Sequence, residues 1–195
     1  SSISYEDEKS SMETLYEKIK KREGNTLSTN DFLTHPDGLF EAGTSSMDKR
    51  FITDIAPNWI NDNCISCNQC SFVCPHSVIR PFLLDQKEYD EAPDYIKERT
   101  IKPIIKGLEE YYFTIAVSIA DCTGCGLCIK KCPGKKLNKA LIFDKINDLK
   151  NNHEQERFDY LEKNIKDKDI DTNTTITSQF KHPRFAFSGA CAGCG

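Results

Sequence analysis

The sequence has no long apolar run and no strong excess of either charge. No stretch approaches the roughly eighteen consecutive apolar residues that a membrane-spanning helix needs, so we expect no spanning segment. The formal net charge of -4, from 26 basic and 30 acidic residues, is too small to indicate a nucleic acid or an anionic membrane as a partner. Residues 1–9 are polar with mixed charge and lack the pattern of a secretory signal, so we expect a protein that is not secreted.

Apolar residues are also scarce. They make up 38% of the 195 residues, charged residues make up 29%, and the mean hydropathy is -0.55. A chain of this length ordinarily forms one compact domain, or a small domain with long arms. We therefore expect the apolar material to be concentrated in one part of the chain, with the rest solvated.

Cysteine is what the sequence has in quantity, with ten residues. Eight of them fall in two runs of identical spacing, C-x2-C-x2-C-x3-C-P, which start at Cys64 and Cys122 and end at Cys74-Pro75 and Cys132-Pro133. The second run follows the first by 58 residues. This repeat predicts two similar halves separated by an insertion.

The spacing of the runs is typical of cubane 4Fe-4S clusters. Three cysteines separated by two residues each can supply three ligands from one loop, which directs its amide N–H groups at the sulfurs, and the fourth ligand comes from elsewhere. In the bacterial pattern the cysteine before proline belongs to the other cluster. The predicted ligand sets are Cys64, Cys67, Cys70 and Cys132 for one cluster, and Cys122, Cys125, Cys128 and Cys74 for the other.

This exchange of ligands has two structural consequences. The two clusters must lie close together, and neither half can fold alone. Gly124 and Gly126 are expected to adopt positive φ where the backbone approaches the cluster, and Pro75 and Pro133 suit the exit of each loop.

Two other uses of cysteine fit less well. A zinc site usually takes two C-x2-C pairs with a long spacer, which leaves half of each run unexplained. Disulfides suit a secreted domain, and no secretory segment is present. The remaining pair, Cys191 and Cys194, is by itself as compatible with a terminal thiol pair as with a metal site.

The rest of the chain gives a coarse pattern of elements. We expect an amphipathic helix over residues 11–22, an irregular arm over 25–63, and a half-buried strand over 111–119. Shorter strands are expected over 141–143 and over 77–80, the latter stopped by Pro81. Short surface helices are expected within 85–110, and a charged helical segment over 145–168 has Phe158, Leu161 and Ile165 as its apolar stripe.

Side chains near the runs have both a simple and a functional interpretation. Several apolar neighbours would pack in a core and would also exclude water from the clusters, namely Ile65, Phe72, Val73, Val78, Ile79, Leu127 and Ile129. A basic group beside the second run is either a solvated face or a docking site for an acidic electron acceptor, and comprises Lys130, Lys131, Lys135, Lys136 and Lys139.

Four segments together resemble the pyruvate:ferredoxin (flavodoxin) oxidoreductase and pyruvate:NADP+ oxidoreductase family over roughly residues 30–195. They are residues 63–81 around the first run, 37–44 with Lys49-Arg50, 121–128 in the second run, and 187–195 around Cys191 and Cys194. In that family the region is a ferredoxin-like domain inside a long multidomain chain, followed by the thiamine diphosphate domain. The resemblance implies that Cys191 and Cys194 are two ligands of a third 4Fe-4S cluster.

The fold that this resemblance implies is α+β, a bacterial-type two-cluster ferredoxin-like domain with an insertion between the runs and long, largely irregular or helical arms. The expected domains are an arm over 1–55, the ferredoxin-like domain over 56–145, a charged helical linker over 146–179, and the start of a thiamine diphosphate domain over 180–195.

The resemblance also implies a function. We expect an electron-transfer segment of an enzyme that oxidises pyruvate to acetyl-CoA, incomplete on its own and without catalytic residues in this sequence. The expected partners are the rest of the multidomain chain and, as electron acceptor, a ferredoxin, a flavodoxin or a fused flavoprotein reductase. The full-length enzyme is expected to be a homodimer in the cytoplasm or in an anaerobic energy organelle. The alternative is a free-standing two-cluster ferredoxin or the iron-sulfur subunit of another redox complex.

Overall fold

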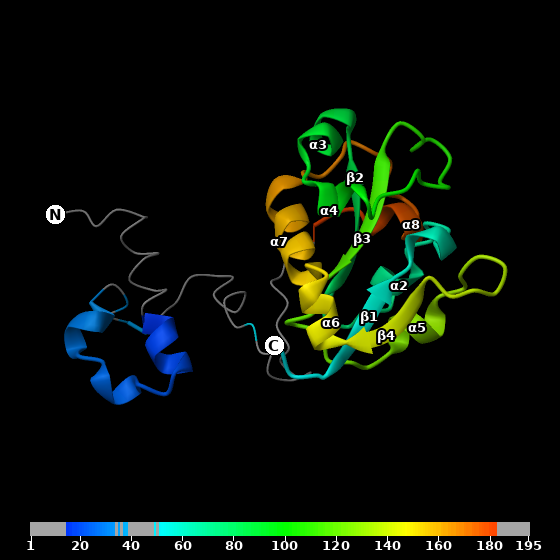
Figure 1. Cartoon of the computed structure of the whole chain (residues 1–195). Coiled ribbons are helices and arrows are strands. Elements are labelled where there is room, and N and C mark those ends of the chain that lie inside the picture. Colours follow the sequence, from blue (N-terminus) through cyan, green and yellow to red (C-terminus); the bar gives the residue numbers. More distant parts are fainter. Residues whose placement is uncertain (1–14, 34, 36, 39–48, 50, 183–195) are drawn as a thin grey trace. The chain divides into compact units, whose positions relative to one another are not determined.

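The computed structural model of the chain describes residues 15–33, 35, 37–38, 49 and 51–182 (Figure 1). The chain divides into two units, Ser1–Thr44 and Ser45–Gly195. In the first unit residues 15–20 are helical, and two short 3-10 helices follow, η1 (Gly24–Thr26) and η2 (Thr29–Phe32). The helix expected over 11–22 is confirmed over 15–20, while residues 11–14 lie outside the described part of the chain.

The second unit is built on two antiparallel two-stranded sheets. β1 (Ile55–Trp59) pairs with β4 (Leu141–Lys145), and β2 (Ile79–Leu84) pairs with β3 (Tyr112–Val117). β1 and β2 flank the first cysteine run, whereas β3 and β4 flank the second. Each sheet therefore takes one strand from each half of the repeat, so the sheets themselves join the two halves (Figure 1).

Two prolines lie inside strands, where the sequence analysis did not expect them. Residues 25–63 were expected to be irregular, and Pro81 to end a strand, but Pro57 lies in the middle of β1 and Pro81 in the middle of β2. In an antiparallel sheet, hydrogen-bonded residue pairs alternate with pairs that are not hydrogen-bonded. The hydrogen bonds from Ile146 N to Asp54 O and from Ser118 N to Val78 O show which pairs are hydrogen-bonded in each of the two sheets. That alternation puts both prolines at positions that donate no ladder hydrogen bond, so neither strand loses one.

β3 is buried on both faces, so the expectation of a half-buried strand over 111–119 is wrong. Phe113 and Ile115 on one face pack in the core cluster that contains the cysteines. Ala116 on the other face packs in a second cluster with Phe158 and Leu161 of α7 (Glu154–Asn164). The alternating sequence predicted the strand, but its small and hydroxyl residues face a helix and not solvent.

Helices occupy the expected ranges. The insertion contains α3 (Gln86–Glu91) and α4 (Asp94–Lys97), and α6 (Ile146–Asn151) and α7 follow β4. The stripe of Phe158, Leu161 and Ile165 is buried, at 1%, 0% and 4% exposure. Figure 1 shows α7 alongside β3, so this charge-rich segment contributes to the core of the second unit.

A buried ionic group fastens α7 to β3. Glu154 and Arg157 are both fully buried, and Glu154 Oε2 accepts from Arg157 Nη1 at 2.6 Å and from Arg99 Nη1 at 2.8 Å. Glu154 Oε1 accepts from the Val117 N–H at 3.0 Å, and Arg157 Nη2 donates to Thr114 Oγ1 at 2.9 Å. Residues of α7 thus satisfy backbone groups of Ile115 and Val117 on the edge of β3 that does not face β2. Farther along the same edge, Phe113 pairs with Ile101.

The remaining short helices sit close to the cysteine runs. They are η4 (Asn61–Asn63), α2 (Gln69–Phe72), α5 (Leu127–Lys131) and α8 (Thr175–Ser178). Among the described residues, no helix combines the length and the apolar character needed to cross a membrane.

Candidate iron-sulfur cluster sites

The two cysteine runs fold into loops of the same backbone shape. The second and fourth residues after the first cysteine have positive φ in both loops: 55° at Ser66 and 53° at Asn68, against 69° at Gly124 and 73° at Gly126. The expectation for the two glycines is confirmed. A positive φ at Ser66 was not predicted, because serine has no strong preference for this conformation, whereas Asn at position 68 is among the residues that tolerate it best.

Tertiary contacts hold the first loop in this conformation. Asn68 Nδ2 donates to Ile176 O of α8 at 2.8 Å, and Ser66 Oγ accepts from the Ile104 N–H at 3.4 Å. Each loop then enters a short helix, α2 or α5, which carries the third cysteine of its run. α2 and α5 pack against each other, which brings Cys70 and Cys128 towards the centre of the unit.

The eight cysteines line two separate cavities. The wall of the first contains Cys64, Cys67 and Cys70 of the first run together with Cys132 of the second. The wall of the second contains Cys122, Cys125 and Cys128 together with Cys74 of the first run. The structure thus brings together the two sets of four thiols that the sequence spacing predicts as ligand sets. Cys191 and Cys194 lie outside the described residues.

Backbone N–H groups point at the thiols in equivalent ways. The Ser66 N–H donates to Cys64 Sγ, and the Gly124 N–H donates to Cys122 Sγ, both at 3.4 Å. Such donors are common around iron-sulfur clusters because they stabilise negative charge on sulfur.

Burial sets the protonation of the thiols. It raises the pKa of Cys122 to about 11 and that of Cys128 to about 12, with the neighbouring Cys74 adding to both shifts. Burial also raises the pKa of Cys64, while the Ser66 N–H and the Trp59 indole N–H lower it in part. Because a metal ligand must be a thiolate, occupation of either cavity by iron releases protons.

The walls of both cavities are otherwise mostly apolar. Trp59, Ile115 and Leu141 line the first, and Pro57, Val78 and Ile79 line the second. Of the apolar neighbours expected to exclude water, Ile65, Val78, Ile79 and Leu127 do line a cavity. Phe72, which is 58% exposed, lines neither cavity, and the same holds for Val73 and Ile129. Trp59 and Pro57 were missed, since β1 was not recognised as a strand.

The donor groups of both cavities have the chemistry of an iron-sulfur site. In the part of the chain that is described, no three His, Cys, Asp or Glu side chains are grouped so as to hold a single metal ion. The donor set is purely thiol, the wall is apolar, and amides face the sulfurs, which is the environment of a 4Fe-4S cluster.

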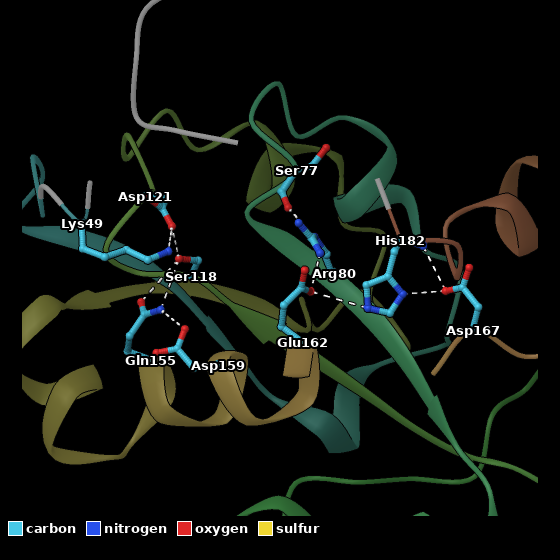
Figure 2. Close-up of polar contacts among 10 residues, drawn as sticks. All are labelled: Lys49, Ser77, Arg80, Ser118, Asp121, Gln155, Asp159, Glu162, Asp167 and His182. Carbon is cyan, nitrogen blue, oxygen red and sulfur yellow. Dashed lines mark hydrogen bonds and ion pairs between the residues drawn. The ribbon is translucent and has the colours of Figure 1, made fainter. Parts of the chain in front are cut away.

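Polar contacts fix the chain just before the second cysteine run and just after the first (Figure 2). Asp121, which precedes Cys122, is 1% exposed and pairs with Lys49 Nζ at 2.6 Å and with Ser118 Oγ. Arg80 Nε donates to Ser77 O at 2.9 Å, and Arg80 also pairs with Glu162 of α7. These contacts anchor the entry to the second run and the exit from the first.

A family model described as a 4Fe-4S dicluster domain matches residues 63–137. The match covers both cysteine runs and the insertion between them. The second unit therefore contains a ferredoxin-like 4Fe-4S dicluster domain, with helices and two small sheets.

Several curated proteins are similar to the chain over most of its length. It is 38% identical to a pyruvate-flavodoxin oxidoreductase of Enterobacter agglomerans, with 91% of this chain and 14% of that protein covered. It is 39% identical to a pyruvate:ferredoxin oxidoreductase of Moorella thermoacetica, with 91% and 15% covered. It is 39% identical to a pyruvate dehydrogenase [NADP(+)] of Euglena gracilis, with 82% and 8% covered. The chain thus spans about one seventh of the length of the first two relatives.

Proposed function

We propose, from the homology of this chain to one segment of the pyruvate-flavodoxin and pyruvate:ferredoxin oxidoreductases, that it is the electron-transfer segment of such an enzyme. In this proposal it relays electrons from the oxidative decarboxylation of pyruvate, which yields acetyl-CoA, to an external acceptor. The observation that carries it is the pair of four-cysteine cavities inside the dicluster domain. The alternative of a free-standing ferredoxin is not favoured, because these relatives are several times longer than this chain.

Two 4Fe-4S clusters are assigned to the two cavities, one to each set of four cysteines. A bound 4Fe-4S cluster accepts and returns one electron at a time. The chain's own residues supply four thiolates per site, direct the Ser66 and Gly124 N–H groups at sulfur, and exclude water with apolar walls. The packing of α2 on α5 supports transfer between the sites, since it places Cys70 of one set near Cys128 of the other.

The longer relatives suggest which further parts the whole enzyme contains. Cys191 and Cys194 are assigned to a third 4Fe-4S cluster, completed by cysteines outside this sequence and placed next to thiamine diphosphate. The proposed domains are an arm over 1–55, the ferredoxin-like domain with its insertion over 56–145, a charged helical linker over 146–179 whose helices α6 and α7 pack on that domain, and the start of the thiamine diphosphate domain over 180–195. The whole enzyme is proposed to be a cytoplasmic or organellar homodimer.

The proposed electron acceptor is a ferredoxin, a flavodoxin or a fused flavoprotein reductase. A basic surface near the first site supports an acceptor protein with an acidic surface. Lys130, Lys131, Lys135 and Lys136 are exposed around Cys132, the exchanged ligand of the first site. Lys139 has a different role, because its Nζ donates to Ile129 O at 2.6 Å and to Lys130 O at 3.2 Å near the end of α5. We call the four exposed lysines the basic patch.

A transfer experiment tests the proposed function. The chain is reconstituted anaerobically with iron and sulfide, reduced with dithionite, freed of excess reductant, and mixed with oxidised flavodoxin in a stopped-flow spectrometer. The proposal predicts that the flavodoxin becomes reduced while the cluster absorbance near 400 nm recovers. A chain that carries its clusters but neither takes up electrons nor passes them on would contradict it.

A further inference from the structure

The wall of the first cavity contains a buried N–H donor, the indole of Trp59, beside the Cys64 thiol. The Trp59 side chain is 2% exposed, and its Nε1 makes no hydrogen bond of ordinary geometry with the described residues, although the N–H lies close enough to Cys64 to lower the pKa of that thiol. Buried N–H groups nearly always have an acceptor, because an unsatisfied one has lost its hydration without compensation. An acceptor inside the cavity would satisfy this donor.

The ring is held in place from several sides. Trp59 lies on β1 opposite Leu141 of β4, and its ring packs edge-on against Phe113, with the centroids 6.1 Å apart. Its backbone carbonyl accepts a hydrogen bond from Arg99, which also pairs with Glu154 of α7. The indole N–H is therefore a fixed donor next to the Cys64 thiol, with little freedom to turn away.

The second site has no such donor at the equivalent position. Trp59 precedes Cys64 by five residues, and the residue that precedes Cys122 by five is Val117. Both residues end a strand that leads into a cysteine run. The loops share the N–H contacts of Ser66 and Gly124, so Trp59 is a difference between two otherwise similar sites, as is His76 on the wall of the second cavity.

We propose that Trp59 Nε1–H donates a hydrogen bond to a sulfur of the cluster held by Cys64, Cys67, Cys70 and Cys132, and that this bond raises the reduction potential of that cluster alone. The inference rests on the proposed function, since it needs clusters in both cavities. Reduction adds one electron from the reductant to the cluster and its thiolates, which makes their sulfurs more negative. A fixed donor binds the more negative sulfur more strongly, so it favours the reduced state.

The test compares Trp59→Phe with Phe113→Leu in the chain reconstituted with iron and sulfide. The first variant removes the N–H and keeps an aromatic ring, whereas the second loosens the same aromatic pair and removes no donor. Each is titrated with dithionite and mediators and followed by electron paramagnetic resonance. For Trp59→Phe we expect one midpoint potential to fall and the other to stay. At a fixed potential the ratio of reduced to oxidised cluster at that site should fall by about tenfold, or about 59 mV for one electron.

A second readout needs no variant. The chain contains a single tryptophan, so labelling tryptophan with 15N marks Trp59 alone. The reduced wild-type protein should then show a 15N hyperfine coupling on one cluster signal. Unchanged potentials in a fully loaded Trp59→Phe protein, equal shifts in Phe113→Leu, or no 15N coupling would each overturn the inference. A wild-type chain that binds no clusters would instead contradict the proposed function, and the iron content distinguishes the two failures.

Discussion

Cys74 of the first run lies beside Cys128 of the second, on the wall of the same cavity. The two thiols are close enough that Cys74 is the largest cause after burial of the raised pKa of Cys128. Cys132 makes the reciprocal crossing and lines the cavity of Cys64, Cys67 and Cys70. Each cavity is thus completed by the other half of the repeat, just as each sheet is completed by a strand of the other half.

The buried thiols make the metal-free chain sensitive to alkali. Cys122 and Cys128 have folded-state pKa values of about 11 and about 12, above the ordinary value of 9.0. Folding therefore favours the protonated thiols, and their contribution is fully present below about pH 9 and is lost as the pH rises towards 11 to 12. Urea midpoints of the reduced, metal-free chain should fall over this range.

The control for this prediction replaces both thiols. A Cys122→Ala, Cys128→Ala chain should show a shallower decline of its midpoint between pH 9 and pH 11, because the other alkaline titrations remain. An equally steep decline in that variant would show that these two thiols do not contribute.

The Glu154 carboxylate should be a large stabilising element of the second unit. Glu154→Ala leaves Arg157 buried without its partner and leaves the Val117 N–H unsatisfied. Removal of one partner of a buried ion pair costs about 3–5 kcal/mol of unfolding free energy. Glu156→Ala, on the same helix, breaks only the exposed pair with His153 and should cost less than about 1 kcal/mol. Chemical denaturation measures both, and similar losses would contradict the role of Glu154.

The basic patch should govern the rate at which an acidic acceptor associates. Lys135→Glu with Lys136→Glu reverses two exposed charges near Cys132 and should slow electron transfer to flavodoxin by about tenfold at low salt, with little effect at high salt. Lys163→Glu with Lys166→Glu, which changes the net charge equally at or just after the end of α7, is the matched control. Equal slowing by both pairs would indicate an effect of net charge and not of docking at the patch.

The sequence predicted most of what depends on local spacing. The two cysteine runs, the positive φ of Gly124 and Gly126 and the buried stripe on α7 all follow from patterns within a few residues. The strand through Pro57, and the continuation of the predicted strand 77–80 through Pro81, were missed because a proline is tolerated there only by virtue of the register of its partner strand. That register is a property of pairs such as Pro57 with Phe143, which are far apart in the chain.

Buried polar residues were missed for a similar reason. In the sequence Glu154 and Arg157 resemble the ordinary charged residues of a solvated helix. They are buried because they bind groups of β3, which lies far away in the chain. Trp59 carried a weak local signal, since a tryptophan five residues before the first cysteine could have been compared with Val117 in the second half. The two positions become equivalent only once residues 55–59 are known to form a strand, as residues 112–117 do.

The exchange of Cys74 and Cys132 between two 4Fe-4S clusters is tested most directly by iron content and spectroscopy of single variants. Wild-type chain, Cys132→Ala and Cys74→Ala are reconstituted anaerobically, and iron is counted while the fluorescence of Trp59 is recorded. We predict two clusters of four irons in the wild type, with the fluorescence quenched by the neighbouring cluster. Cys132→Ala should lose the cluster next to Trp59, so that about half of the iron is lost and the fluorescence is regained. Cys74→Ala should lose the other cluster, so that an equal amount of iron is lost while the fluorescence stays quenched. The reverse assignment, or a wild type that binds zinc and no iron-sulfur cluster, would contradict the account.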